Sequence, residues 1–134
     1  MRKQQGRELL KDYADAETLL AQPGISLSYS VEDLHKICAR TQARFKIGAT
    51  HCPLKRWLGY LDRQGNWVPA LCRDFASMSV VPVADNLEAI DGEIDLINKW
   101  KSNPLCLNNT KGGENISTEE CTSPYFLYVC FHKR

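Results

Sequence analysis

The sequence predicts an α+β fold: a small, mainly antiparallel three-stranded sheet flanked by helices, with an added N-terminal helix and an added C-terminal strand. Apolar runs of strand length begin at Ile25, Phe45 and Phe75, and another covers Tyr125–Phe131. Apolar residues recur at helical spacing between these runs. The 134 residues, 43% of them hydrophobic, are enough for one ordinary globular domain. We therefore expect a helical extension over residues 1–23 and a single domain over residues 24–134.

The first elements are predicted from apolar spacing and a helix cap. Residues 1–20 have the pattern of an amphipathic helix, and the apolar run from Ile25 to Val31 predicts a strand. Ser30 is a suitable N-cap for a helix with Glu32 and Asp33 in its first turn. The side chains expected to point inward from this helix are Leu34, Ile37 and Cys38.

The next strand and helix contain the first candidate site residues. Phe45–Ala49 predicts a strand with Gly48 near its end, and Pro53 suits the first turn of a following helix that we expect to end near Leu61. The apolar face of this helix consists of Leu54, Trp57, Leu58 and Leu61. Arg56 lies off that face. A helical arginine close to a glycine suits bidentate recognition of a phosphate.

The remaining elements follow a turn-rich segment at residues 62–66. Phe75–Val83 predicts a strand with Pro82 at an edge or an end, and Asp85 caps a helix over residues 86–100. The expected buried stripe of this helix consists of Leu87, Ile90, Ile94, Ile97 and Trp100. Glu93 neighbours the stripe. The aromatic and β-branched run Tyr125–Phe131 is the strongest strand pattern in the chain.

Composition narrows the classes of function. We find no apolar run long enough to cross a membrane and no signal-peptide pattern, so we expect an intracellular protein, cytoplasmic or nuclear, with reduced thiols. The six cysteines include no C-x-x-C pair, which gives zinc binding little support. Net charge is only +1, but seven basic residues and one acid lie between Lys36 and Arg63, and five acids without a base lie between Asp85 and Asp95. A basic segment facing an acidic helix suits a metal-dependent phosphodiesterase.

Three short motifs together resemble the GIY-YIG nuclease superfamily. Lys46-Ile47-Gly48 is similar to the second half-motif of that family, and Arg56 follows the glycine by eight residues, as the family's helical arginine does. The segment Glu88-Ala89-Ile90-Asp91-Gly92-Glu93-Ile94-Asp95-Leu96-Ile97 resembles the helix that carries the family's metal-binding glutamate, which maps to Glu93. Asn108 matches an asparagine that closes the site in the family. The resemblance covers roughly residues 45–109.

The resemblance implies a metal-dependent DNA endonuclease. Glu93 would bind Mg²⁺ or Mn²⁺, and Arg56 would stabilise charge on the phosphate. Lys46 would lower the pKa of a catalytic phenol or hold phosphate. The residues expected to contact substrate are Gly48, His51, Lys55 and Asn108. Specificity would come from the loop at residues 108–115, the terminal additions, a homodimer or a protein partner. The alternative is a catalytically silent module on the same scaffold that binds nucleic acid or protein.

The first half-motif of the family is absent from its usual place. Gly24-Ile25-Ser26 has a serine where the family has a tyrosine. Tyr29 is the nearest phenol, and we place it slightly ahead of Tyr128. Tyr128 would supply the phenol if the strand at 125–131 filled the same sheet position by permuted connectivity.

Overall fold

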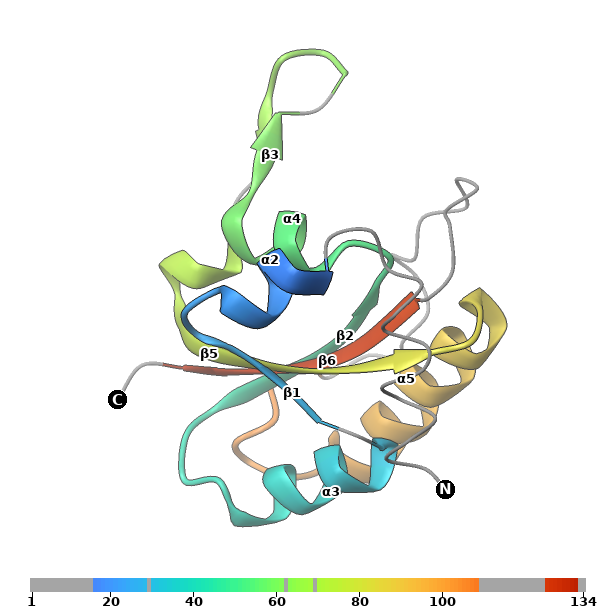
Figure 1. Ribbon diagram of the computed structural model, residues 1–134. Helices are drawn as coiled ribbons and strands as arrows, with labels where there is room; N and C mark the ends of the chain where they lie inside the picture. Colours follow the sequence, from blue (N-terminus) through green and yellow to red (C-terminus); the bar gives the residue numbers. More distant parts are fainter. Residues whose placement is uncertain (1–15, 29, 62, 69, 109–124, 133–134) are drawn as a thin grey trace.

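The computed structural model of this protein describes residues 16–28, 30–61, 63–68, 70–108 and 125–132. The main sheet contains four strands, namely β1 (Ile25–Leu27), β2 (Phe45–Thr50), β5 (Phe75–Val83) and β6 (Tyr125–His132). The helices are α2 (Ala16–Ala21), α3 (Val31–Arg40), α4 (Pro53–Leu58) and α5 (Asn86–Trp100), with a short 3₁₀ helix η1 (Leu71–Arg73). A separate hairpin pairs β3 (Tyr60–Leu61) with β4 (Trp67–Val68). The α+β class is therefore confirmed (Figure 1).

The sheet is mixed and has the order β1-β5-β6-β2. Strand β6 lies between β5 and β2 and is antiparallel to both, whereas β1 is parallel to β5 at one edge. The expected three-stranded sheet with a C-terminal strand as an addition is therefore wrong: β6 is an interior strand. The reason is hydrophobic burial, because every residue from Tyr125 to Phe131 is buried and such a continuous run needs cover on both faces.

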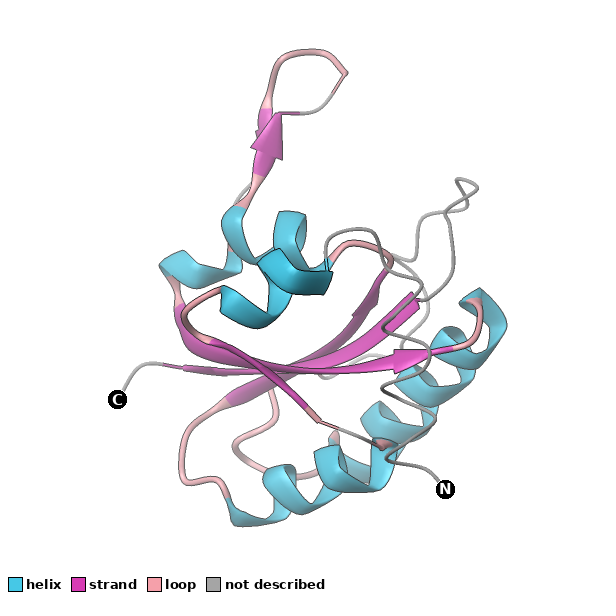
Figure 2. Ribbon diagram, viewed as in Figure 1, coloured by secondary structure: helices cyan, strands magenta, loops and turns pink. Residues whose placement is uncertain are grey.

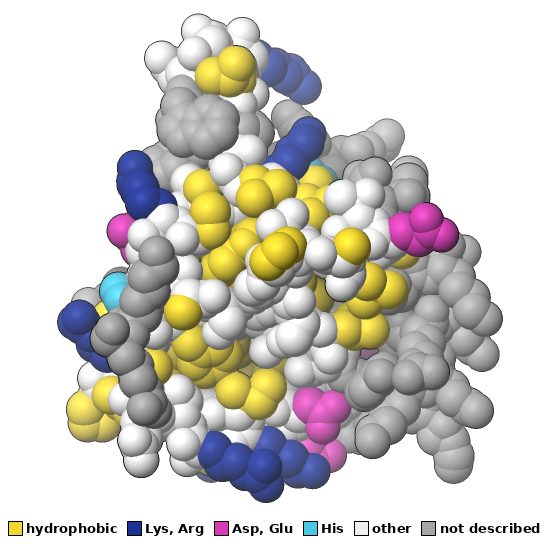
Figure 3. Space-filling view, turned by 60° about the vertical axis from the view of Figure 1, so that its left-hand side comes forward, with side chains coloured by type: hydrophobic (Ala, Val, Ile, Leu, Met, Phe, Trp, Pro, Cys, Tyr) yellow, Lys and Arg dark blue, Asp and Glu magenta, His cyan; other side chains and the backbone are white. Residues whose placement is uncertain are grey.

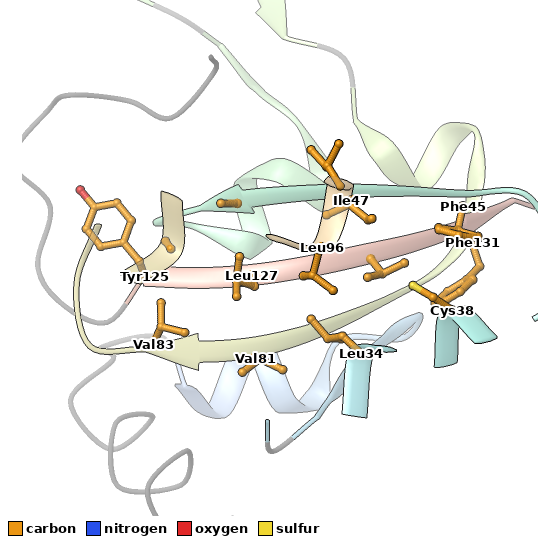
Figure 4. Close-up of a cluster of buried hydrophobic side chains, with 14 residues drawn as sticks. Leu34, Cys38, Phe45, Ile47, Val81, Val83, Leu96, Tyr125, Leu127 and Phe131 are labelled. Atoms are coloured by element: carbon orange, nitrogen blue, oxygen red, sulfur yellow. The ribbon is translucent and has the colours of Figure 1, made fainter. Parts of the chain in front are cut away.

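Helices cover the two faces of the sheet (Figure 2). On the face that we call the α5 face, α3 and α5 cover a cluster that includes Leu34, Ile47, Leu96 and Leu127 (Figure 4). On the opposite face, the α4 face, α2 and α4 cover a cluster that includes Leu19, Trp57, Met78 and Tyr128. Leu19 is fully buried, so α2 is packed into the domain.

Two predicted helix starts are confirmed by side-chain caps. The hydroxyl of Ser30 accepts a hydrogen bond from the Asp33 N–H at 3.2 Å, and Oδ1 of Asp85 accepts one from the Glu88 N–H at 2.8 Å. Glu88 Oε2 in turn accepts from the Ala84 N–H at 2.9 Å. These bonds satisfy N–H groups that have no partner within the helix. None of the described helices is long and apolar enough to span a membrane.

The expected apolar stripes of α4 and α5 need correction. The buried residues of α5 are Ala89, Glu93, Leu96 and Ile97, so Glu93 lies within the buried face, while Leu87 is 67% exposed. Helix α4 ends at Leu58 because Gly59, with a φ of 89°, turns the chain into the hairpin. Leu58 and Leu61 are consequently 45% and 65% exposed.

Candidate functional site

The candidate site is built around Gly48, where β2 passes under the ring of Tyr128. Gly48 and Tyr128 are paired residues of the antiparallel strands β2 and β6. A Cβ atom at position 48 would lie 2.3 Å from both Cζ and the hydroxyl oxygen of Tyr128. Real Cβ contacts are never that short, so only glycine allows the phenol to cross the β2 backbone here. The glycine of the predicted motif is therefore explained by a close approach.

Arg56 is brought to this phenol by the packing of α4. Trp57, the next residue, is 3% exposed and belongs to the core of the α4 face. Its ring also lies against Gly24, where a Cβ would come within 2.8 Å of it. With Trp57 fixed inward, Arg56 is left half-buried, and its positive charge acts on both Tyr128 and Cys130. The arginine is thus near enough for its charge to act on the phenol that crosses Gly48.

Glu93 reaches the same region from α5. It is 8% exposed, and its negative charge helps to raise the pKa of Tyr128, although α5 covers the opposite face. Gly92 permits this approach, because a Cβ there would lie 2.5 Å from Cδ1 of Leu127 on β6. Sequence reasoning did not identify Gly92. Its position inside a helix, where glycine is unfavourable, was the available sign of close packing.

Tyr128 is held in its neutral form. Burial is the main cause that raises the pKa of Tyr128 above its usual range, since the side chain is only 4% exposed. Arg56 lowers this pKa, whereas Cys130 and Glu93 raise it further. The phenol can therefore orient a neighbouring molecule by hydrogen bonding but is poorly suited to act as a base.

Lys46 is exposed and lies two residues before Gly48 on β2. Its register partner is Cys130, and its positive charge lowers the pKa of that thiol against the dominant effect of burial, which raises it to about 12. Arg56 also lowers the pKa of Cys130, so the charges of both cations act on this residue, which lies two positions after Tyr128 on β6.

Asn108 closes the outer edge of β2. Its Oδ1 accepts a hydrogen bond from the Ile47 N–H at 2.7 Å, and its Nδ2 donates to the Ile47 carbonyl at 2.9 Å. The preceding segment continues the pairing, with Phe45 N–H donating to the Leu105 carbonyl and Leu107 N–H donating to the Phe45 carbonyl. The amide of Asn108 thus replaces a neighbouring strand beside Gly48. Its observed contacts hold β2 in position, next to the proposed substrate surface.

The other predicted residues are more scattered. The ring of His51, just after β2, makes an edge contact with Tyr125 at 6.1 Å between centroids. Lys55 is exposed on α4. Tyr29 and residues 109–115 of the predicted loop lie outside the described residues. The structure thus pairs Gly48 with Tyr128, and the charges of Arg56 and Glu93 act on this phenol. Lys46 lies on the same strand as Gly48, and Asn108 is hydrogen-bonded to the outer edge of that strand.

The side chains of the candidate site could hold a cation through one carboxylate, that of Glu93. Within the described ranges, no three His, Cys, Asp or Glu side chains form a group that could hold a metal ion. Mg²⁺ commonly retains several waters and binds one or two carboxylates together with substrate phosphate. Glu93 is a buried carboxylate that could hold a cation in that mode, together with waters.

Comparison with known proteins gives no further guide to the site. No family model, curated protein or solved structure matches this chain.

Proposed function

We propose that this protein is a metal-dependent endonuclease that hydrolyses phosphodiester bonds in DNA. The observation that carries the proposal is the close approach of the Tyr128 phenol to Gly48 of the Lys46-Ile47-Gly48 motif, supported by the charges of Arg56 and Glu93, both of which act on this phenol. The three residues come from α4, α5 and β6 and are far apart in the sequence. A cation, a carboxylate and a phenol are groups that phosphodiester hydrolysis can use.

The sheet order supports the permuted form of the GIY-YIG resemblance. Strand β6 lies directly beside β2, which carries Lys46-Ile47-Gly48, and Tyr128 is the register partner of the glycine. In this arrangement Tyr128 supplies the phenol of the absent first half-motif, although it comes last in the chain. This modifies our sequence-based preference for Tyr29, which lies outside the described residues.

The proposed roles follow from burial and charge. Arg56 and Lys46 bind the phosphate and neutralise charge that grows on its oxygens in the transition state. Tyr128, kept neutral, orients the attacking water. Mg²⁺ or Mn²⁺, when bound at Glu93, supplies further electrostatic stabilisation of the phosphate. Water adds to phosphorus and one P–O bond to a deoxyribose oxygen breaks; one water proton ends on the leaving alcohol and the other passes to solvent.

A silent binding module is the second candidate, favoured by two observations. Glu93 is only 8% exposed, and the pKa of Tyr128 is raised by burial, so neither group is positioned as an obvious base. A scaffold with these features can still bind a nucleic-acid backbone through Lys46, Lys55 and Arg56. Such a module would bind DNA equally well with and without a divalent cation and would leave the DNA intact.

Cleavage assays separate the two candidates. We expect the protein to nick or cut supercoiled plasmid or branched DNA with Mg²⁺ or Mn²⁺ and to leave it intact with EDTA. Glu93→Gln should reduce cleavage by about a hundredfold or more, because the variant loses the carboxylate charge and keeps nearly the same volume. Asp91→Asn, an exposed carboxylate on the same helix, is the matched control and should cleave normally.

Arg56→Ala tests the phosphate-binding side of the site. It should reduce cleavage by about the same factor, while Arg40→Ala, an exposed arginine on α3, should not. Circular dichroism should give the same folded spectrum for all variants. Full cleavage by Glu93→Gln or Arg56→Ala would refute the site, and intact DNA with retained gel-shift binding would establish the silent module.

A further inference from the structure

The hairpin of β3 (Tyr60–Leu61) and β4 (Trp67–Val68) contributes no residue to the candidate site. It follows α4 directly and projects away from the body of the sheet (Figure 1). At its tip, residues 63–66 are all exposed, and a Cβ at Gly65 would find no atom within 4 Å. We call the described residues of this hairpin, 60, 61 and 63–68, the arm. It extends into solvent from the helix that carries Arg56.

The arm combines exposed leucine with positive charge. Leu61 on the arm is 65% exposed, and Leu58 at its base is 45% exposed. The segment from residue 55 to residue 73 contains four basic residues, Lys55, Arg56, Arg63 and Arg73, against one acid, Asp62. Hydrophobic and basic side chains are visible together toward this projecting end in Figure 3. An apolar side chain among cations suits a polyanion that also offers apolar surface, and nucleic acid with exposed base faces has both properties.

We propose that the arm is a wedge that recognises branched DNA, with Leu61 inserted at an unstacked base step. The inference rests on the proposed function, because it places the scissile phosphate at Arg56, four residues before the arm begins. Leucine is among the side chains that insert between base steps and kink a duplex. Insertion costs less where bases are already unpaired, so the wedge selects a junction over a uniform duplex. Arg63 at the tip would bind a flanking phosphate.

The test measures binding without cleavage. Fluorescence anisotropy in EDTA gives the affinity for a three-way junction and for a uniform duplex of the same length at one salt concentration. The parent should prefer the junction, and Leu61→Ala should reduce the ratio of the two affinities by roughly tenfold. Leu87→Ala is the matched control, since Leu87 is 67% exposed on α5 and should leave the ratio unchanged.

A probe of base stacking and a charge variant sharpen the test. 2-Aminopurine at the branch point should brighten on binding of the parent or Leu87→Ala, but not of Leu61→Ala. Arg63→Ala should weaken binding to both DNAs and lower the slope of log affinity against log salt by about one, as expected for one phosphate contact.

Several results would overturn the wedge. The first is a parent protein that binds the junction and the duplex equally well, and the second is an unchanged ratio of the two affinities in Leu61→Ala. The third is a parent dimer, seen by light scattering, that Leu61→Ala converts to a monomer. That result would make the arm an interface between copies. Failure of the nuclease proposal has a different signature. In that case DNA stays intact with Mg²⁺ while the junction preference and its loss in Leu61→Ala remain.

Discussion

The two faces of the sheet are built differently, although each is covered by two helices. On the α5 face, α3 and α5 have 10 and 15 residues, and both begin with a side-chain cap. On the α4 face, α2 and α4 have six residues each, and α4 has no side-chain cap. The α5 face consists largely of packed apolar side chains, whereas the α4 face contains Tyr128 and Arg56. We therefore expect the face with the longer, capped helices to contribute more of the stability. Tyr128 and Arg56 of the candidate site lie on the α4 face, and Glu93 acts on Tyr128 from α5.

The largest expected effect lies on the α5 face. Leu96 is fully buried between α5 and the sheet, so Leu96→Ala should lower the free energy of unfolding by about 3 kcal/mol, as a lost side chain and a cavity both contribute. Leu54→Ala on α4, where the side chain is only partly buried, should cost about 1 kcal/mol. Urea unfolding measures both. An equal loss from the two variants would contradict the difference in burial between Leu96 and Leu54.

The second prediction concerns the close approach at Gly48. Gly48→Ala should lower the free energy of unfolding by about 2 kcal/mol, because the new methyl group would collide with the Tyr128 ring. The cost should shrink in a Tyr128→Leu background, which removes the two atoms at 2.3 Å. A double-mutant cycle by urea unfolding measures this coupling. Additive costs would mean that the phenol does not occupy the space above Gly48.

Local sequence patterns gave much of this fold, and long-range pairing supplied the remainder. The caps at Ser30 and Asp85 need only residues within one turn, so both helix starts could be predicted. The interior place of β6 depends on register with β2 and β5, which lie at least 42 residues earlier in the chain, and no local pattern contains that information. The prediction that Leu87 belongs to the buried stripe of α5 was wrong for a related reason. Gly92 packs against Leu127, so the face of α5 around Gly92 turns toward the sheet.

The sequence indicated the individual residues of the candidate site but not how the fold brings them together. Lys46, Gly48, Arg56, Glu93 and Asn108 could be named from the resemblance to the GIY-YIG family. The choice between Tyr29 and Tyr128 could not be made, because it depends on which strand lies beside β2. The two hydrogen bonds of Asn108 to Ile47 join residues 61 positions apart, and only the folded chain reveals that this amide completes a strand edge.

A third prediction compares one buried thiol from each face. Burial raises the pKa of Cys38 on the α5 face and of Cys130 on the α4 face to about 12, from a usual value near 9. A raised pKa in the folded state contributes stability that is complete below pH 9 and is lost as pH rises from 9 through 12. Each thiol should therefore add about 1.4 kcal/mol per pH unit to the alkaline loss of stability.

The measurement is urea unfolding between pH 8 and pH 10.5. Cys38→Ala and Cys130→Ala should each give a shallower decline above pH 9 than the parent, whatever their stability at pH 8. Arg56→Ala should leave the Cys38 contribution unchanged, because Arg56 acts on Cys130 and not on the opposite cluster. Identical slopes in the parent and both cysteine variants would show that neither thiol is buried as described.

The smallest expected effect is a contact between the two helices of the α5 face. Trp100 Nε1 on α5 donates a hydrogen bond to His35 Nδ1 on α3 at 2.9 Å. Burial and the charge of Lys99 lower the pKa of His35, while Asp95 and Glu32 oppose them. A lowered histidine pKa contributes stability that is present above pH 6.5 and is lost as pH falls below it, because protonated Nδ1 cannot accept the bond.

We expect the free energy of unfolding to fall by less than about 1 kcal/mol between pH 7.5 and pH 5 from the protonation of His35. His35→Ala should remove that part of the decline, and Trp100→Phe, which deletes the donor, should reduce it. A parent and a His35→Ala variant with the same pH dependence would mean that the bond between α3 and α5 does not depend on a neutral imidazole.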